Sequence, residues 1–164
     1  MSLDVSEFRI EKRRAEAELT LTMGACIKGC FFLSGLRATF AGPERIADLL
    51  NAEGGFFPFE VHGDSSPYTV ICNRSQLVLV TLLDMPVEAQ ADPGYSLAKK
   101  REVRIVLSTG RTIHGRVRIY RPTGRDRLSD YAREPDMFRY IETDNRTVIV
   151  NSAHIVEMQE TSEA

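Results

Sequence analysis

The chain has 164 residues, of which 43% are hydrophobic and 27% charged, and its formal net charge is −2 at pH 7. This balance excludes a disordered, highly charged chain, and no apolar run reaches the 18 or more residues that a membrane span needs. Because no signal-peptide pattern opens the sequence, we expect a cytoplasmic protein with no membrane association.

The chain begins with a change of periodicity. We expect a short N-terminal helix over Asp4–Ala15, because one acidic residue stands at its cap position and a second follows three residues later. From Ala15 to Met23, apolar and polar residues alternate, which predicts a half-buried strand. A second strand is predicted over Cys26–Leu33, where Gly29 indicates a bend or a close backbone approach.

A helical turn and three more strands complete the first half. Apolar residues at helical spacing predict the turn over Glu44–Asn51, and we expect it to cover one end of a small barrel. Asn73 precedes the last strand in a tight connection, where asparagine tolerates a left-handed conformation, and Asn151 has the same place in the second half. Short apolar runs predict strands over Phe56–Val61, Tyr68–Asn73 and Gln76–Leu83.

Residues 85–99 contain proline and glycine without clear periodicity and are interpreted as a linker. The linker separates an N-terminal repeat, residues 1–84, from a C-terminal repeat, residues 100–164. The second repeat is predicted to contain strands over Arg101–Ser108, Thr112–Tyr120, Met137–Thr143, Arg146–Asn151 and His154–Gln159, with a helical turn over Asp126–Arg133.

Three sequence landmarks occur twice and in the same order. They are Gly-x-x-Ile-x-Gly from Gly24 and Gly110, the helical-turn segments RIADL and RLSDY, and the segments TVICNRSQLV and TVIVNSAHIV. The offset between the copies falls from 86 to 82 to 78 residues, so the differences lie in loops. The pattern indicates a duplicated module of roughly 78 residues. Each helical-turn segment pairs Arg with Asp three residues later, which we expect to anchor the turn.

The second half combines a strand with glycines at Gly110 and Gly115 and a closing apolar-turn-apolar segment, VIVNSAHIVEM. This combination resembles the Sm/LSm-like family. The resemblance implies a mainly β protein of two tandem Sm-like (SH3-type) five-stranded small barrels, each with a short helical insertion between strands 2 and 3. The family usually has glycine in the last turn, where Asn73-Arg74 and Asn151-Ser152 stand here. Arg-x-x-Asp turns also replace the Asp and Asn that the family carries after the second strand, so no RNA-binding residue of the family is carried over.

Basic residues are concentrated in the second repeat, with ten Lys or Arg against two acidic residues between Lys99 and Arg127. Alternation places His114 and the next three alternate residues on one face of the second strand. An RNA or nucleotide could bind there, or the arginines could pair with carboxylates of this chain. In the loop after this strand, the spacing of Arg121 and Arg125 resembles the arginine half of the PilZ motif for cyclic dinucleotides, although the second half of that motif is missing. The candidate ligand residues are Arg116, Arg118, Tyr120, Arg121 and Arg125.

In the first repeat, Cys30 and Phe32 stand where the second repeat has arginines. We expect this apolar face to be an interface, covered by the other repeat or by a second chain. Three cysteines favour reduced thiols, because Cys26 and Cys30 would lie about 13 Å apart on a strand at ~3.3 Å per residue.

The sequence contains no zinc-ligand spacing, phosphate loop or nucleophile motif, so we expect no metal, no cofactor and no catalytic residue. The favoured hypothesis is a non-enzymatic scaffold that self-associates, as a dimer, or binds a protein partner. The alternative is RNA or nucleotide binding through the arginine face.

Overall fold

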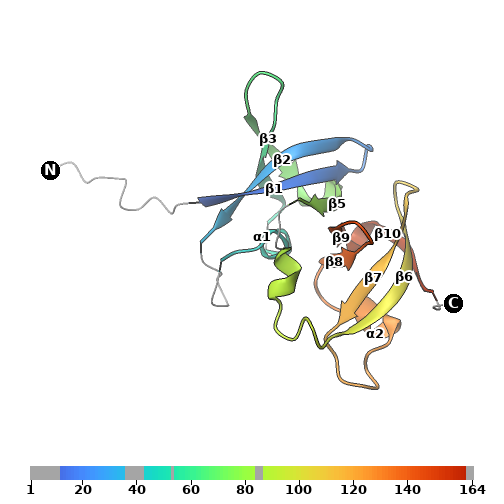
Figure 1. Ribbon diagram of the computed structural model, residues 1–164. Helices are drawn as coiled ribbons and strands as arrows, with labels where there is room; N and C mark the ends of the chain where they lie inside the picture. Colours follow the sequence, from blue (N-terminus) through green and yellow to red (C-terminus); the bar gives the residue numbers. More distant parts are fainter. Residues whose placement is uncertain (1–11, 36–42, 53, 84–86, 162–164) are drawn as a thin grey trace.

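The structure is a computed structural model that describes residues 12–35, 43–52, 54–83 and 87–161. In these ranges the chain forms one ten-stranded antiparallel sheet (Figure 1). The first five strands are β1 (Lys12–Leu21), β2 (Cys26–Ser34), β3 (Phe56–Val61), β4 (Tyr68–Asn73) and β5 (Leu77–Leu82). The second five are β6 (Lys99–Leu107), β7 (Thr112–Ile119), β8 (Phe138–Glu142), β9 (Thr147–Asn151) and β10 (Ile155–Glu160).

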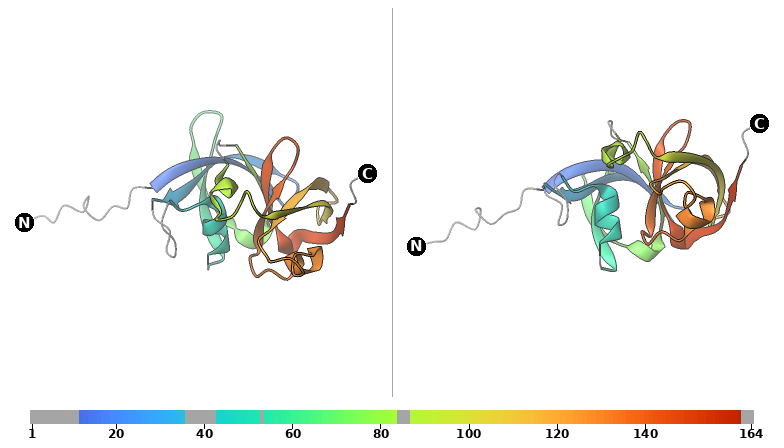
Figure 2. Two further views of the ribbon diagram at one scale, coloured as in Figure 1. Left: turned by 60° about the horizontal axis from the view of Figure 1, so that its bottom comes forward. Right: turned by 90° about the horizontal axis from the view of Figure 1, so that it is seen from below.

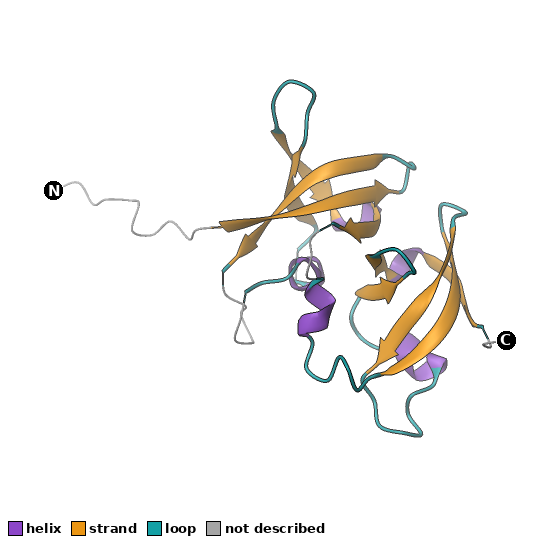
Figure 3. Cartoon of the chain, in the orientation of Figure 1, coloured by secondary structure: helices purple, strands orange, loops and turns teal. Residues whose placement is uncertain are grey.

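Short helical segments connect the strands (Figure 3). They are two α-helices, α1 (Ile46–Asn51) and α2 (Leu128–Ala132), and three 3-10 turns, η2 (Arg74–Gln76), η3 (Glu88–Ala91) and η4 (Ser152–His154). The predicted Arg and Asp pairs open the two α-helices, since Asp48 accepts the backbone N–H of Arg45 at 2.8 Å and Asp130 accepts that of Arg127 at 3.0 Å. In the described part of the chain, neither α-helix has the length or apolarity that crossing a membrane would require.

The two halves of the sheet have the same spatial order of strands. The first half runs β5-β1-β2-β3-β4 and the second runs β10-β6-β7-β8-β9. They join at a seam where β5 pairs with β9, with Leu79 opposite Val150 and Val80 opposite Ile149. The sequence predicts two small, closed or nearly closed barrels, whereas the structure has one open sheet through both halves (Figure 2). The reason is that β5, the fifth strand of the first half, finds its second partner in the other half.

The two Gly-x-x-Ile-x-Gly segments lie in equivalent surroundings, since each runs from the turn after the first strand of its half into the second strand. A Cβ atom at Gly29 would lie 1.9 Å from the carbonyl oxygen of Glu60 on β3. A Cβ atom at Gly115 would lie 2.6 Å from the carbonyl oxygen of Glu142 on β8. Only glycine permits so close an approach of the neighbouring strand, as the sequence predicts for Gly29.

Apolar side chains cross the seam and connect two hydrophobic cores. The core of the first half is built on three phenylalanines and also contains Phe138 and Ile149 from the second half. The core of the second half contains Val78 and Leu79 from β5. Because each core includes residues of both halves, the seam is a packed interior contact and not a loose junction.

Two local predictions differ from the structure. Of the helix expected at Asp4–Ala15, residues 4–11 lie outside the described residues, and residues 12–15 belong to β1, where the apolar alternation already holds. Asn73 and Asn151 have φ values of −85° and −75°, so neither is left-handed. Instead, each side-chain oxygen accepts a backbone N–H two residues later at 3.0 Å, and so caps a 3-10 turn.

Candidate functional site

The outermost strands of the sheet expose apolar side chains whose counterparts at the seam are buried. Val78 on β5 is 0% exposed, whereas Val156, which has the equivalent place on β10, is 67% exposed. Ile149 on β9 is 0% exposed, whereas the equivalent Ile71 on β4 is 65% exposed. In the described chain, β4 and β10 end the strand order, so each has one edge without a strand partner. The outer strand β10 is therefore the counterpart of the seam strand β5, and the outer strand β4 is the counterpart of the seam strand β9.

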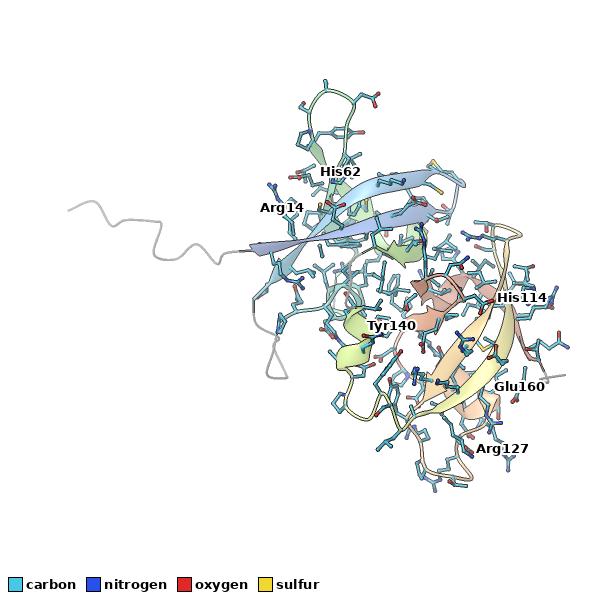
Figure 4. All side chains as sticks on the ribbon, viewed as in Figure 1. Arg14, His62, His114, Arg127, Tyr140 and Glu160 are labelled. Atoms are coloured by element: carbon cyan, nitrogen blue, oxygen red, sulfur yellow. The ribbon has the colours of Figure 1, made fainter. Side chains whose placement is uncertain are left out.

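The segment that the sequence predicts as a linker is packed between the two halves. Its turn η3 carries Glu88, whose carboxylate accepts the backbone N–H groups of Ile46 at 2.8 Å and Ala47 at 3.0 Å. The same carboxylate accepts the hydroxyl of Tyr140 on β8 at 2.5 Å (Figure 4). Glu88 therefore joins the start of α1 to a strand of the second half.

A cavity of about 890 Å³ is lined by α1, the linker, β7 and β8. Within it, Arg45 contacts Asp48 at 3.2 Å and also contacts Asp92, whereas Arg139 donates to backbone carbonyls. Burial and the Glu88 carboxylate raise the pKa of Tyr140, and burial and Asp92 raise that of Tyr120. Both phenols therefore stay protonated and act as hydrogen-bond donors.

The predicted arginine face pairs with carboxylates of the same chain. Arg116 lies 3.6 Å from both Glu102 and Asp144. Arg118 donates to Glu142 at 2.5 and 3.3 Å. Hydrogen bonds to both carboxylate oxygens hold Arg118 in a fixed orientation, and its charge is already neutralised. The anion that would bind this face must therefore compete with groups of the protein.

The remaining candidate ligand residues lie around the loop after β7. Arg121 donates to Glu134 at 2.7 Å, and the Tyr120 hydroxyl donates to Asp92 at 3.3 Å. Arg125 is exposed, and no partner of its side chain is found among the described residues. Three of the five candidates, Arg118, Tyr120 and Arg121, line the cavity described above, whereas Arg116 and Arg125 lie outside it.

The predicted interface residues Cys30 and Phe32 present little apolar surface. Cys30 is only 4% exposed, because Glu16 and His62 lie over it with atoms 3.6 and 3.5 Å from its Sγ. Burial and the Glu16 carboxylate raise the pKa of this thiol to about 11. Phe32 is half-buried, with the guanidinium of Arg14 6.0 Å from its ring centre. Among the large apolar residues that are exposed in the described chain, Tyr68 and Ile71 lie on β4 and Val156 on β10, and the others, Leu97 and Met23 among them, lie on β3 or in loops.

The described cysteines and tyrosines with a shifted pKa all shift in the same direction. Its three cysteines are free thiols, as the odd count predicts. A nucleophilic thiol or phenol needs a lowered pKa. Burial instead raises the pKa of every described cysteine and tyrosine whose pKa is shifted: Cys30, Cys72, Tyr95, Tyr120, Tyr131 and Tyr140.

No protein-family model, curated protein or solved structure matches the chain. The function must therefore be inferred from the surfaces of the protein itself. The edges of β4 and β10 are the strongest candidates, because they combine unpaired backbone groups with exposed apolar side chains.

Proposed function

We propose that the protein is a non-enzymatic, cytoplasmic scaffold, built from a duplicated Sm-like module, that self-associates through the edges of its sheet. Three features shared by the two halves support the duplication: the strand order, a helix after the second strand, and a capped 3-10 turn before the fifth strand. Self-association rests on one observation, the exposure of Val156 and Ile71 where their seam counterparts are fully buried.

In the proposed assembly, β4 of one copy pairs antiparallel with β10 of the next copy. The register of the internal seam, transferred to these strands, sets Met158 opposite Ile71 and Glu157 opposite Cys72. Backbone hydrogen bonds would hold the strands together, and the exposed apolar side chains would gain burial, each contributing about 1.5–3 kcal/mol when fully buried. The contact is head-to-tail, so repeated addition of copies forms a closed ring or an open filament. The smallest closed ring is a dimer in which each copy pairs its β4 with β10 of the other.

Light scattering coupled to gel filtration tests the proposal over a range of protein concentrations. Wild-type protein should exceed the monomer mass of 18.4 kDa and grow toward the oligomer as concentration rises. Ile71→Glu and Val156→Glu should each return the mass to that of the monomer, because a buried unpaired carboxylate opposes strand pairing. Met23→Glu is the matched control, since Met23 is 82% exposed and lies outside the edge strands. Wild-type protein that remains monomeric at high concentration would rule the proposal out.

Binding of RNA or a nucleotide to the arginine face is the second candidate. It has less support, because Arg116, Arg118 and Arg121 each have a carboxylate partner in this chain. Retention on single-stranded RNA at low salt, lost in the double variant Arg116→Glu with Arg118→Glu, would favour it. Absence of retention at low salt would remove it.

A further inference from the structure

Three potential metal ligands from three neighbouring strand segments meet on the outer face of the first half. Glu16 lies on β1, Cys30 on β2 and His62 directly after β3. Cys30 Sγ lies 3.5 Å from His62 Nε2 and 3.6 Å from Glu16 Oε1, and the latter two atoms are 3.7 Å apart. The three ligand atoms therefore form a nearly equilateral triangle.

The size of this triangle suits one tetrahedral metal ion. Zinc binds thiolate sulfur at about 2.3 Å, and imidazole nitrogen and carboxylate oxygen at about 2.0–2.2 Å. At tetrahedral angles these bond lengths separate the ligand atoms by about 3.3–3.6 Å. The three observed separations are within a few tenths of an ångström of that range, so an ion could bind with small side-chain adjustments.

The backbone fixes the positions from which the three side chains converge. Glu16 and Cys30 are directly opposite each other in the β1–β2 pairing, so their side chains share one face. The backbone N–H of His62 donates to the carbonyl of Lys28 at 3.0 Å and holds the end of β3 beside β2. Figure 4 places His62 on the same half of the molecule as Arg14, whose guanidinium neutralises Glu60 at 3.3 Å.

The equivalent positions of the second half contain a complete ion-pair triad. Glu102 corresponds to Glu16, and Arg116 lies opposite it as Cys30 lies opposite Glu16. Asp144 corresponds to His62, and the Arg116 guanidinium lies 3.6 Å from each of these two carboxylates. The second half thus carries its own cation between two acidic groups. The first half has a thiol at that position, between a carboxylate and an imidazole.

We propose that Glu16, Cys30 and His62 bind one Zn²⁺ ion, which takes the place that the Arg116 guanidinium has in the second half. A thiol, an imidazole and a carboxylate together favour zinc over magnesium or calcium, which prefer oxygen ligands alone. The Glu16 and His62 side chains are 51% and 43% exposed, so the ion has access from solvent and a water molecule completes the tetrahedron. As the Zn–S bond forms, the thiol releases its proton to solvent.

Bound zinc would join β1, β2 and the end of β3, and so stabilise the first half of the sheet. A ligand that binds only the folded state raises stability with its concentration, by about 2.7 kcal/mol at one hundred times its dissociation constant. This inference does not depend on the proposed self-association, because the three ligands lie on the sheet face and belong to neither edge strand.

Cobalt, a spectroscopic substitute for zinc, tests the site in the full chain after metal removal by a chelator. Wild-type protein should bind one Co²⁺ with a thiolate-to-metal charge-transfer band, and added Zn²⁺ should displace it and raise the melting temperature. Cys30→Ser, His62→Gln and Glu16→Gln should each lower zinc affinity at least roughly tenfold, and Cys30→Ser should abolish the charge-transfer band. Glu16→Gln keeps the test valid if Cys30→Ser fails to fold, because Glu16 is half-exposed.

Cys26→Ser is the matched control, since Cys26 is an exposed thiol on the same strand. It should bind both metals as the wild type does. The double variant Cys30→Arg with His62→Asp recreates the triad of the second half and should fold without binding zinc. No charge-transfer band in the wild type with excess Co²⁺ at neutral pH, or a band lost in Cys26→Ser and kept in Cys30→Ser, would overturn the proposal.

Discussion

Alanine at Gly29 or at Gly115 should destabilise the protein by unequal amounts. Real Cβ contacts keep at least 3.0 Å, whereas a Cβ at Gly29 would meet the Glu60 carbonyl oxygen at 1.9 Å. At Gly115 the corresponding contact with Glu142 is 2.6 Å. Relieving the overlap requires β3 to move by about 1.1 Å, but β8 by only about 0.4 Å. Overpacking costs about 1–3 kcal/mol, so we expect about 3 kcal/mol or more for Gly29→Ala and about 1–2 kcal/mol for Gly115→Ala.

Urea unfolding at one fixed protein concentration measures both values. Gly55→Ala is the control, because nothing lies within 4 Å of its added Cβ and its backbone conformation suits any residue. Its free energy of unfolding should change by no more than about 0.5 kcal/mol. Equal losses at Gly29 and Gly115, or a loss at Gly55 as large as theirs, would refute the close-approach explanation of the two glycines.

Two further changes test the contacts between the halves and their pH dependence. Asn51→Ala should lower the free energy of unfolding by about 1 kcal/mol, because the Asn51 side-chain amide forms hydrogen bonds with the backbone N–H and C=O of Phe138 at 2.8 and 3.0 Å. Asn145→Ala is the control: Asn145 lies in an exposed turn, so the free energy of unfolding should hardly change. Burial would raise the pKa of Glu142, but hydrogen bonds from Arg118 and a tyrosine outweigh it and lower that pKa. The stability that this carboxylate adds is therefore present above the ordinary carboxyl pKa and is lost as pH falls through the lowered pKa. The midpoint of urea unfolding of the wild type should fall between neutral and acid pH, and Glu142→Gln should make that fall smaller.

Period-two alternation and turn residues predict all ten strands to within a few residues. The join between the two halves is not local and could not be placed in the same way. Continuous apolar runs, typical of strands buried on both faces, occur at residues 77–80 and 148–150 on the seam strands, but residues 70–72 on the edge strand β4 form one as well. Such runs therefore do not distinguish the seam strands from an edge strand.

The contacts of the candidate residues depend on strand pairing, which the sequence pattern does not contain. Alternation correctly places Arg116 and Cys30 on equivalent outward positions, but it cannot show that one is paired with carboxylates and the other lies under polar side chains. The zinc ligands Glu16 and His62 are 46 residues apart in the sequence, so they have no local metal-binding spacing. Strand register brings them together, and register depends on the pairing of the whole sheet.

Head-to-tail pairing of β4 with β10 is tested by mixing two variants that each lack one functional edge. Ile71→Glu retains only a functional β10 edge, and Val156→Glu retains only a functional β4 edge. Each variant alone should have the mass of a monomer, and an equal mixture should form a one-to-one dimer with a single seam. A mixture that remains monomeric, while the wild type associates, would contradict the account.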